Sequence, residues 1–250
     1  DPVTPPETEA GSGTLRDCTS SRFLEGILEA GGGDYFDGIG FHAYDYYYGE
    51  LGSYGSAGWN SSFDTSGPVL IAKARYLKSL LKKYGIPDKE LLNTELAVLC
   101  GRDGKEDYCQ GEDFVNTKAY YVAQSNAAAL AEGLRANIWY SLTGWRGSGL
   151  LDSKGQPNAA FQAFQFAASQ LDQASYEGAV DDFPGVKGYR FTLGKKSLWL
   201  IWSLDGEEHV ITLSEKPTAV LDVFGKPAGE VSQDNKLTVS IAPVYIQWGP

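Results

Sequence analysis

The pattern of apolar and polar residues changes near residue 172 and divides the chain into two parts. In the first part, stretches with apolar residues at helical spacing alternate with short apolar runs. The pattern predicts helices over residues 23–28, 69–81, 114–132 and 159–169, strands over residues 36–42, 91–95 and 136–140, and a long loop over residues 43–66. Strands and helices that alternate this closely are typical of βα units in a parallel sheet.

The second part has a different periodicity. Short alternating runs predict strands over residues 188–193, 197–202, 209–213, 219–223, 236–241 and 244–247. Turn signals such as Asp205-Gly206 separate these runs, which is typical of an antiparallel β-sandwich. We therefore expect an α/β domain over residues 1–171, followed by a β-sandwich domain over residues 172–250.

Polar and aromatic side chains gather where the predicted strands of the first part end. These candidate site residues are His42, Tyr44, Asp45, Asn93, Glu95, Trp139, Tyr140 and Trp145. Because ligands bind at the carboxyl ends of parallel strands, we expect these side chains to converge on one site. Glu95 is the strongest candidate, because a carboxylate after two leucines loses hydration unless it is paired or used in chemistry. A buried ion pair is the structural alternative for Glu95, and a structural histidine is the alternative for His42.

Several short motifs follow one another in an order that carries a family resemblance. They are residues 37–44 (Asp-Gly-Ile-Gly-Phe-His-Ala-Tyr), 84–87 (Tyr-Gly-Ile-Pro), 92–95 (Leu-Asn-Thr-Glu), 139–140 (Trp-Tyr) and 149–157. This order resembles the last three βα units of clan A glycoside hydrolases, whose catalytic domains are (β/α)8, or TIM, barrels. Residues 222–225 and 243–246 resemble the β-sandwich that often follows such barrels. The resemblance implies a partial (β/α)8 barrel and a following β-sandwich.

The chemistry that this resemblance implies centres on Glu95. By the resemblance, Glu95 matches the nucleophile of a retaining glycosidase, which attacks the anomeric carbon and forms a covalent glycosyl-enzyme. His42 and Tyr44 would hydrogen-bond this carboxylate or the sugar, and Trp139 or Trp145 would offer a stacking face. The expected partner is a glycan substrate, and no cofactor is expected.

The chain lacks the second carboxyl group that this mechanism needs. In the family, the acid/base glutamate follows an asparagine at the end of the fourth strand, and no Asn-Glu pair occurs in this sequence. Only about 35 residues precede the predicted strand that ends in His42, too few for five βα units of roughly 30 residues each. We therefore expect an N-terminal barrel portion on a separate chain, on a swapped partner or on a region removed from this chain. Glu50 is the candidate for the acid within the chain.

The composition favours a glycan ligand over several others. The chain has 15 Tyr, 6 Trp and 11 Phe, and aromatic rings stack on the C–H faces of sugars as well as fill cores. A net charge of −11 argues against nucleic acid and favours neutral or cationic ligands. No run approaches the roughly 20 apolar residues needed to span a membrane. The second hypothesis for the function is a non-catalytic carbohydrate-binding or scaffold protein.

The cysteines bear on the compartment. Cys100 and Cys109 flank a polar loop, so a disulfide between them would imply an extracellular or other oxidising compartment. Cys18 is then either a free thiol or paired with a segment outside this chain. Metal binding has less support, because neither Cys100 nor Cys109 lies in a CxxC pair and the only histidines are His42 and His209. A cysteine hydrolase that uses Cys100 or Cys18 with His42 is a weaker third alternative.

Overall fold

The first part of the molecule is an α/β structure, as the sequence predicts. The computed structural model describes residues 22–56 and 66–249, so Cys18 lies outside the described residues. The elements of the first part are α1 (Phe23–Glu29), η2 (Gly32–Tyr35), β1 (Gly38–Tyr47), β2 (Tyr54–Gly55), α2 (Leu70–Lys83), β3 (Glu90–Leu99), η3 (Asp107–Cys109), α3 (Glu112–Ala131), β4 (Ala136–Trp139) and α4 (Ala159–Leu171). Strands β1, β3 and β4 are parallel neighbours, and β2 pairs antiparallel with the end of β1. The sheet order is therefore β2-β1-β3-β4.

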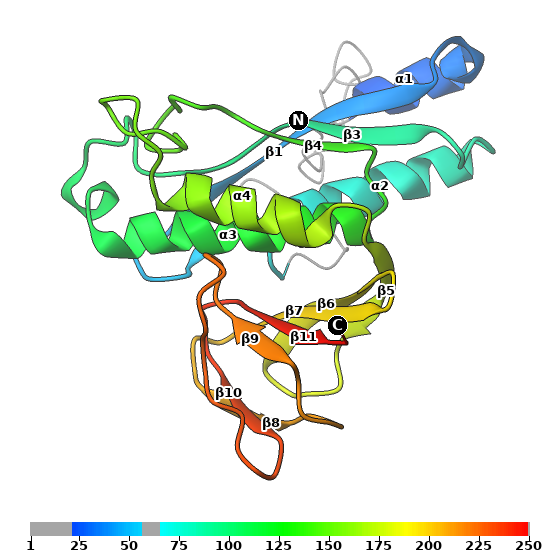
Figure 1. The fold of residues 1–250 in the computed structure, drawn as a ribbon. Helices are drawn as coiled ribbons and strands as arrows, with labels where there is room; N and C mark the ends of the chain where they lie inside the picture. The colour runs from blue at the N-terminus through cyan, green and yellow to red at the C-terminus, as the bar shows by residue number, and fades with distance from the viewer. Residues whose placement is uncertain (1–21, 57–65, 250) are drawn as a thin grey trace.

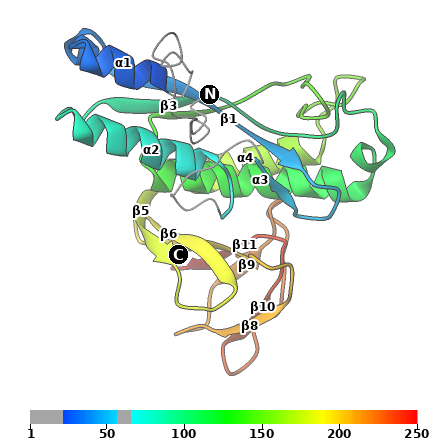
Figure 2. The ribbon, with the colours of Figure 1, turned by 180° about the vertical axis from the view of Figure 1, so that it is seen from behind.

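The helices α2 and α3 cover one face of this sheet. Val69, just before α2, and Tyr121 of α3 both hydrogen-bond to Asp45 of β1. The ring of Tyr121 also contacts the ring of Trp139 in β4. Figure 1 shows the sheet on one side of α3 and α4. Figure 2 views the molecule from behind and shows α2 on that same side of α3. The opposite face carries Ile138 of β4, which is 52% exposed.

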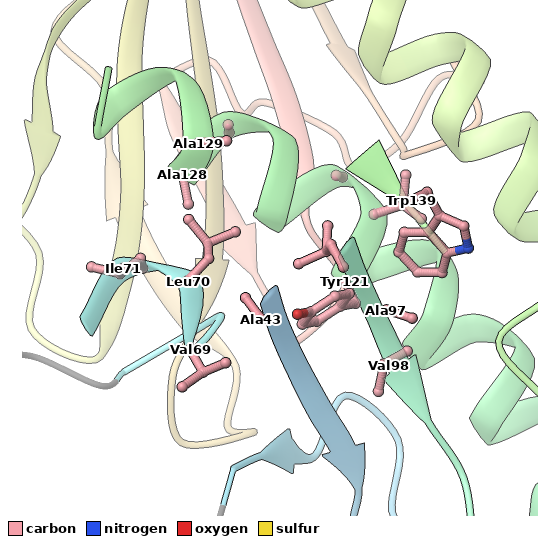
Figure 3. Packing of buried hydrophobic residues seen from close by; sticks show 14 of the residues in the cluster. Ala43, Val69, Leu70, Ile71, Ala97, Val98, Tyr121, Ala128, Ala129 and Trp139 are labelled. Atoms are coloured by element: carbon pink, nitrogen blue, oxygen red, sulfur yellow. The ribbon is translucent and has the colours of Figure 1, made fainter. Parts of the chain in front are cut away.

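Small side chains allow α3 to pack closely on its neighbours. The fully buried alanines of α3 and α4 include Ala119, Ala123, Ala127, Ala128, Ala160 and Ala163. Alanine has the highest helix propensity and lets two helix backbones approach each other closely. Figure 3 shows Ala128 of α3 beside Leu70 of α2, with Tyr121 next to β1 and β3. Helices, sheet and loops therefore share one continuous hydrophobic core.

The second part is an antiparallel β-module. Its strands are β5 (Ser175–Val180), β6 (Val186–Leu193), β7 (Lys196–Ser203), β8 (His209–Thr212), β9 (Ala219–Leu221), β10 (Lys236–Val239) and β11 (Val244–Trp248). They form a five-stranded sheet in the order β5-β6-β7-β11-β9 and a two-stranded sheet of β8 and β10. One face of the larger sheet joins the core of the first part, where Tyr245 contacts Phe166 of α4. The other face, with Ile201 and Ile246, forms a second core with β8 and β10.

Several strands differ from the sequence predictions. β1 continues to Tyr47 and β3 to Leu99, so residues 43–47 are strand rather than loop. In β1 the buried side of the strand includes Asp45, a carboxylate that interrupts the apolar alternation by which strands are predicted. The sequence pattern also misses β5, because this mostly exposed edge strand has a register shift between Tyr176 and Gly178 and little apolar alternation.

Candidate active site

A β-bulge in β3 sets the direction of the Glu95 side chain. In the parallel pairing of β1 with β3, Phe41 lies opposite Asn93, but His42 lies opposite Glu95, so Thr94 is an extra residue. Side chains alternate along a regular strand, so without the bulge Glu95 would share the helix-covered face with Asn93. The bulge turns Glu95 to the opposite face, beside His42.

Hydrogen bonds between neighbouring strands fix this bulge. The Asn93 amide, oriented by its partners, donates to the backbone carbonyl oxygens of Phe41 and Glu95 over 3.1 and 2.9 Å. The Thr94 hydroxyl donates to the same Phe41 oxygen over 3.2 Å. The side-chain amides of Asn93 and Asn137 of β4 lie 2.8 Å apart. Because Asn93 is fully buried, these bonds form with little competition from water and hold the backbone on both sides of the bulge.

Glu95 has two close polar partners on its face of the sheet. The Tyr44 hydroxyl donates to Glu95 Oε2 over 2.5 Å, and His42 Nδ1 lies 3.3 Å from the same oxygen. The Glu95 side chain is 32% exposed, so a ligand can reach it. A carboxylate that is both held in place and accessible is suited to act on a ligand.

Tyr44 and Lys73 support this arrangement from opposite sides of the strand. Burial, and then the hydrogen bond to Glu95 and its negative charge, raise the pKa of Tyr44 well above the ordinary tyrosine value. The hydroxyl therefore keeps its proton and remains a donor. From α2, the Lys73 ammonium donates to the backbone carbonyl of His42 over 2.9 Å, which fixes the strand next to Glu95.

Aromatic rings from the loop after β4 lie beside Tyr44. The ring centroids of Tyr140 and Trp145 lie 6.3 and 6.2 Å from that of Tyr44, and both contacts are edge to face. Tyr140 is 40% exposed and Trp145 is 51% exposed. Exposed rings offer a flat apolar surface on which the C–H face of a sugar stacks. The two exposed rings and the Glu95 carboxylate therefore all contact Tyr44.

Ser148 fixes the loop that carries Trp145. Its hydroxyl accepts a hydrogen bond from the Trp145 backbone N–H over 3.0 Å and donates to the Tyr140 carbonyl over 3.1 Å. Its own carbonyl accepts from Trp139 Nε1 over 3.0 Å. Ser148 is fully buried, so its hydrogen bonds hold the backbone of the two exposed aromatic residues in place.

A buried lysine of α3 supports the same loop from below. The Lys118 ammonium donates to the carbonyl oxygens of Gly147 and Gly149 over 2.9 and 2.8 Å. It also lies 5.4 Å from the ring centroid of Phe114. Burial lowers the pKa of Lys118 to about 8. In the described part of the chain, no carboxylate forms an ion pair with this lysine.

The predicted disulfide between Cys100 and Cys109 is confirmed, with a Cα–Cα distance of 5.7 Å. It closes the loop that follows β3. The Cys100 backbone N–H donates to the Arg146 carbonyl over 2.9 Å, so the disulfide-closed loop and the Trp145 loop are joined. Inside the disulfide-closed loop, the Glu106 carboxylate accepts hydrogen bonds from backbone N–H groups of its own loop.

Three candidate site residues lie on the helix-covered face instead. Asp45 is fully buried and accepts a hydrogen bond from the Tyr121 hydroxyl over 2.8 Å. Trp139 is buried next to Tyr121, as Figure 3 shows, and Asn93 holds the bulge. These positions do not fit the expectation that the three residues bind substrate directly, because the strands separate them from the Glu95 face.

Asp45 and Lys73 place opposite charges between β1 and α2. Burial raises the pKa of Asp45 to about 6, while hydrogen bonds from Val69 and Tyr121 and the charge of Lys73 act in the opposite direction. Burial lowers the pKa of Lys73 to about 8, against the effect of the Asp45 charge. The Asp45 Oδ1 atom has no hydrogen-bond partner within the ranges 22–56 and 66–249. These charges connect the strand to the helix behind the site.

Glu50 lies apart from the residues that contact Glu95. It lines a cavity of about 270 Å³ next to the β-module, together with Trp202 and Ile241. Neither Tyr44 nor His42 lines that cavity.

Among the described residues, no group of three or more His, Cys, Asp or Glu side chains is arranged to hold a metal ion. No helix built from those residues is long and apolar enough to cross a bilayer.

Sequence reasoning missed two cations near the site, Arg146 and Lys118. Lys118 lies in an alanine-rich helix, where nothing in the pattern separates it from an exposed lysine. Arg146 follows Trp145 between Gly144 and Gly147. Those glycines were the available signal, because glycine favours the left-handed conformations of a tightly wound loop.

Comparisons with known proteins show that this fold also occurs in solved glycoside hydrolases. No protein-family model matches the chain, and no curated protein sequence matches it. Among solved structures, the chain is similar to a family 39 glycoside hydrolase from Bacteroides cellulosilyticus WH2, with a TM-score of 0.67 and 18% identity over 91% of this chain and 47% of the other. It is also similar to a β-porphyranase of family 86 from Bacteroides plebeius, with a TM-score of 0.55 and 12% identity over 92% of this chain and 45% of the other.

A third similar structure is a glucosidase from Croceicoccus marinus, with a TM-score of 0.51 and 13% identity over 92% of this chain and 57% of the other. At these identities the likeness is one of fold. The fold is thus one that glycoside hydrolases use. The chain spans about half the length of these three structures, between 45% and 57% of each.

Proposed function

We propose that this chain carries the nucleophile of a retaining glycoside hydrolase, and that Glu95 is this nucleophile. The observation that carries the proposal is an accessible carboxylate held by Tyr44 and His42 beside exposed aromatic rings. A retaining enzyme needs an ionised carboxylate that reaches the anomeric carbon of a bound sugar. The fold shared with glycoside hydrolases supports the same function.

The residues around Glu95 take definite roles in this mechanism. Glu95 attacks the anomeric carbon and displaces the leaving group, and water then hydrolyses the covalent glycosyl-enzyme. Tyr44 and His42 both contact Oε2, so Oε1 is the oxygen that would attack. Tyr140 and Trp145 would stack on the sugar ring and align it for this attack.

The acid/base carboxyl group comes, in this proposal, from a portion of the protein outside this chain. Retaining enzymes place it about 5–5.5 Å from the nucleophile, whereas Glu50 lines a cavity whose lining residues include neither Tyr44 nor His42. An N-terminal barrel portion would supply the missing group.

The sheet supports the proposed partial (β/α)8 barrel, over residues 1–171. β1 and β4 are its outer parallel strands, and Ile138 is exposed on the face opposite the helices. The remaining βα units of a barrel would pair with these outer strands and cover this face. The β-module, over residues 172–250, would be the β-sandwich that follows the barrel.

The test uses Glu95→Gln in the complete protein. Turnover of the best substrate should fall by about 1,000-fold or more while sugar affinity stays within about threefold, because the amide keeps the shape but cannot attack. A 2-fluoro glycoside with a good leaving group should label the wild-type peptide that contains Glu95, as detected by mass spectrometry.

Glu90→Gln is the matched control, because Glu90 begins the same strand and its exposed side chain pairs with Arg135 at 3.6 Å. That variant should keep full turnover and labelling. Full turnover by Glu95→Gln would refute the assignment.

A non-catalytic carbohydrate-binding protein is the second candidate, and the exposed rings of Tyr140 and Trp145 favour it. It predicts glycan binding that depends on Trp145, with no turnover and no labelling of Glu95 in the complete protein. The labelling experiment therefore separates the two candidates.

The disulfide bears on where the protein works. A Cys100–Cys109 bond is stable in an oxidising environment and rare in a reducing one. This supports an extracellular or other oxidising compartment for the enzyme.

A further inference from the structure

An arginine lies between two aromatic rings next to the candidate site. The guanidinium carbon of Arg146 lies 5.2 Å from the ring centroid of Tyr46 and 5.5 Å from that of Trp145. Tyr46 follows Tyr44 by two positions on β1, so both share the face that carries Glu95. The ring of Trp145 in turn contacts that of Tyr44. Arg146 therefore lies on the same surface as Glu95, and the rings of Trp145 and Tyr44 lie between them.

The charge of Arg146 is not neutralised by the described residues. Among them, no carboxylate forms an ion pair with Arg146, and its buried Nε has no hydrogen-bond partner. Glu106, in the neighbouring disulfide-closed loop, is already bonded to backbone N–H groups. Arginine stays charged at any working pH. A cationic donor held beside a ligand surface in this way is suited to an anionic group.

Lys118 adds a second positive charge beneath the same loop. Its ammonium bonds to the carbonyl oxygens of Gly147 and Gly149 and not to a carboxylate of the described chain. Charges act over longer distances in a buried, low-dielectric region than in water. Arg146 and Lys118 thus place two positive charges at this loop, here called the positive region, in a chain whose net charge is −11.

The loop backbone holds Arg146 in a fixed place. Arg146 has a φ of 51°, and Gly144 and Gly147 are also left-handed, with φ of 74° and 76°. A residue with a side chain adopts this conformation only where its surroundings impose it. The Cys100 N–H bond to the Arg146 carbonyl is one such restraint. A cation that is already ordered loses little freedom when it binds a ligand.

We propose that Arg146 binds an anionic group of the glycan, the carboxylate of a uronic acid or a sulfate ester, on a sugar next to the one that Glu95 attacks. This rests on the proposed function and specifies its substrate class. A planar guanidinium donates parallel hydrogen bonds to such groups, and Tyr46 and Trp145 keep its plane from turning. The net charge favours neutral or cationic ligands, but recognition at contact distance depends on the local charge.

The experiment measures binding in the complete protein with Glu95→Gln, so that glycans bind without being cleaved. A glycan array compares each charged glycan with a neutral glycan of the same backbone. One set carries uronic acids and the other carries sulfate esters. Calorimetry then gives Kd for the charged and neutral glycans of the best pair. The charged member should bind about 10- to 100-fold more tightly than its neutral parent. Arg146→Gln should remove this preference and change the neutral Kd by less than about threefold, and Arg146→Lys should keep part of it.

Arg135→Gln is the matched control, because it removes the same charge from an exposed arginine just before β4. It should leave the preference intact. The proposal is overturned if no charged member is preferred on either arm. It is also overturned if Arg146→Gln weakens the binding of charged and neutral glycans equally. Arg146 would then only hold the Trp145 ring in position. Turnover by Glu95→Gln would instead refute the nucleophile without affecting the binding contrast.

Discussion

The two faces of the four-stranded sheet use polar residues in different ways. On the face opposite the helices, Tyr44 and His42 contact Glu95, and these side chains remain accessible. On the helix-covered face, Asp45 and Asn93 of the same strands are fully buried, and their hydrogen bonds join strands to one another and to the helices. A polar residue in a strand must therefore be assigned to a face before it is assigned a function.

Asp45→Ala should have the largest effect and tests the helix-covered face. The substitution leaves the Tyr121 hydroxyl and the Val69 N–H without this acceptor and removes the negative charge near Lys73. We expect the free energy of unfolding to fall by about 3–5 kcal/mol, measured by urea denaturation. Asp45→Asn keeps one acceptor and should lose less. A loss below about 1 kcal/mol for the alanine variant would contradict this role.

Asn93→Leu should have the next largest effect, because it removes the amide that holds both sides of the bulge. We expect a loss of about 2–3 kcal/mol in the free energy of unfolding. Turnover of the complete protein should also fall more than about 10-fold, because Glu95 is no longer held toward the substrate. The measurements are urea denaturation and kcat.

Thr218→Val is the control for that experiment. The Thr218 hydroxyl lies in the β-module and donates to the Gln247 carbonyl over 2.9 Å. Its loss should cost about 1 kcal/mol of stability with kcat unchanged. Equal losses of kcat in both variants would mean that stability, and not the bulge, controls activity.

The helices and most strands follow from the apolar pattern, but the direction of Glu95 does not. A regular strand would put Glu95 on the same face as Asn93. The bulge at Thr94 depends on bonds from Asn93 to the carbonyl of Phe41 and to Asn137, residues far apart in the sequence. A single sequence shows no such pairing. Glu95 could be selected as a candidate because a carboxylate in an apolar run is costly, and not because its direction was known.

The two tryptophans near the end of the third predicted strand show the same limit. Trp139 lies within this strand and Trp145 in the loop after it, and either could offer a stacking face. Trp139 is buried because its position in β4 faces α3, whereas Trp145 lies in a loop that Ser148 and Lys118 hold against the helix. The choice depends on which face the helix covers, and this is a tertiary property.

Tyr44→Phe tests the opposite face and should change activity more than stability. It removes the hydroxyl that donates to Glu95 Oε2 and keeps the ring beside Tyr140 and Trp145. We expect kcat/KM of the complete protein to fall about 10- to 30-fold, with the free energy of unfolding within about 1 kcal/mol of wild type. Tyr48→Phe, at an exposed tyrosine just after β1, should change neither. A large loss of stability with normal kinetics would mean that Tyr44 serves the fold and not the site, contrary to the role assigned to its face of the sheet.

Lys118→Met should have the smallest effect. It tests the buried ammonium group of α3 that donates hydrogen bonds to the loop carrying Trp145. The pKa of Lys118 in the folded protein, about 8, lies below its value of 10.5 in the unfolded chain. Between these values the unfolded chain binds a proton that the folded protein has released, so the stability of the wild type rises with pH. The variant lacks this contribution. From about pH 7.5 to about pH 9.5, wild type should therefore gain about 1–2 kcal/mol relative to Lys118→Met in urea denaturation. A difference that does not change with pH would mean that the ammonium group is solvated, and the positive region proposed beneath Arg146 would lose its buried component.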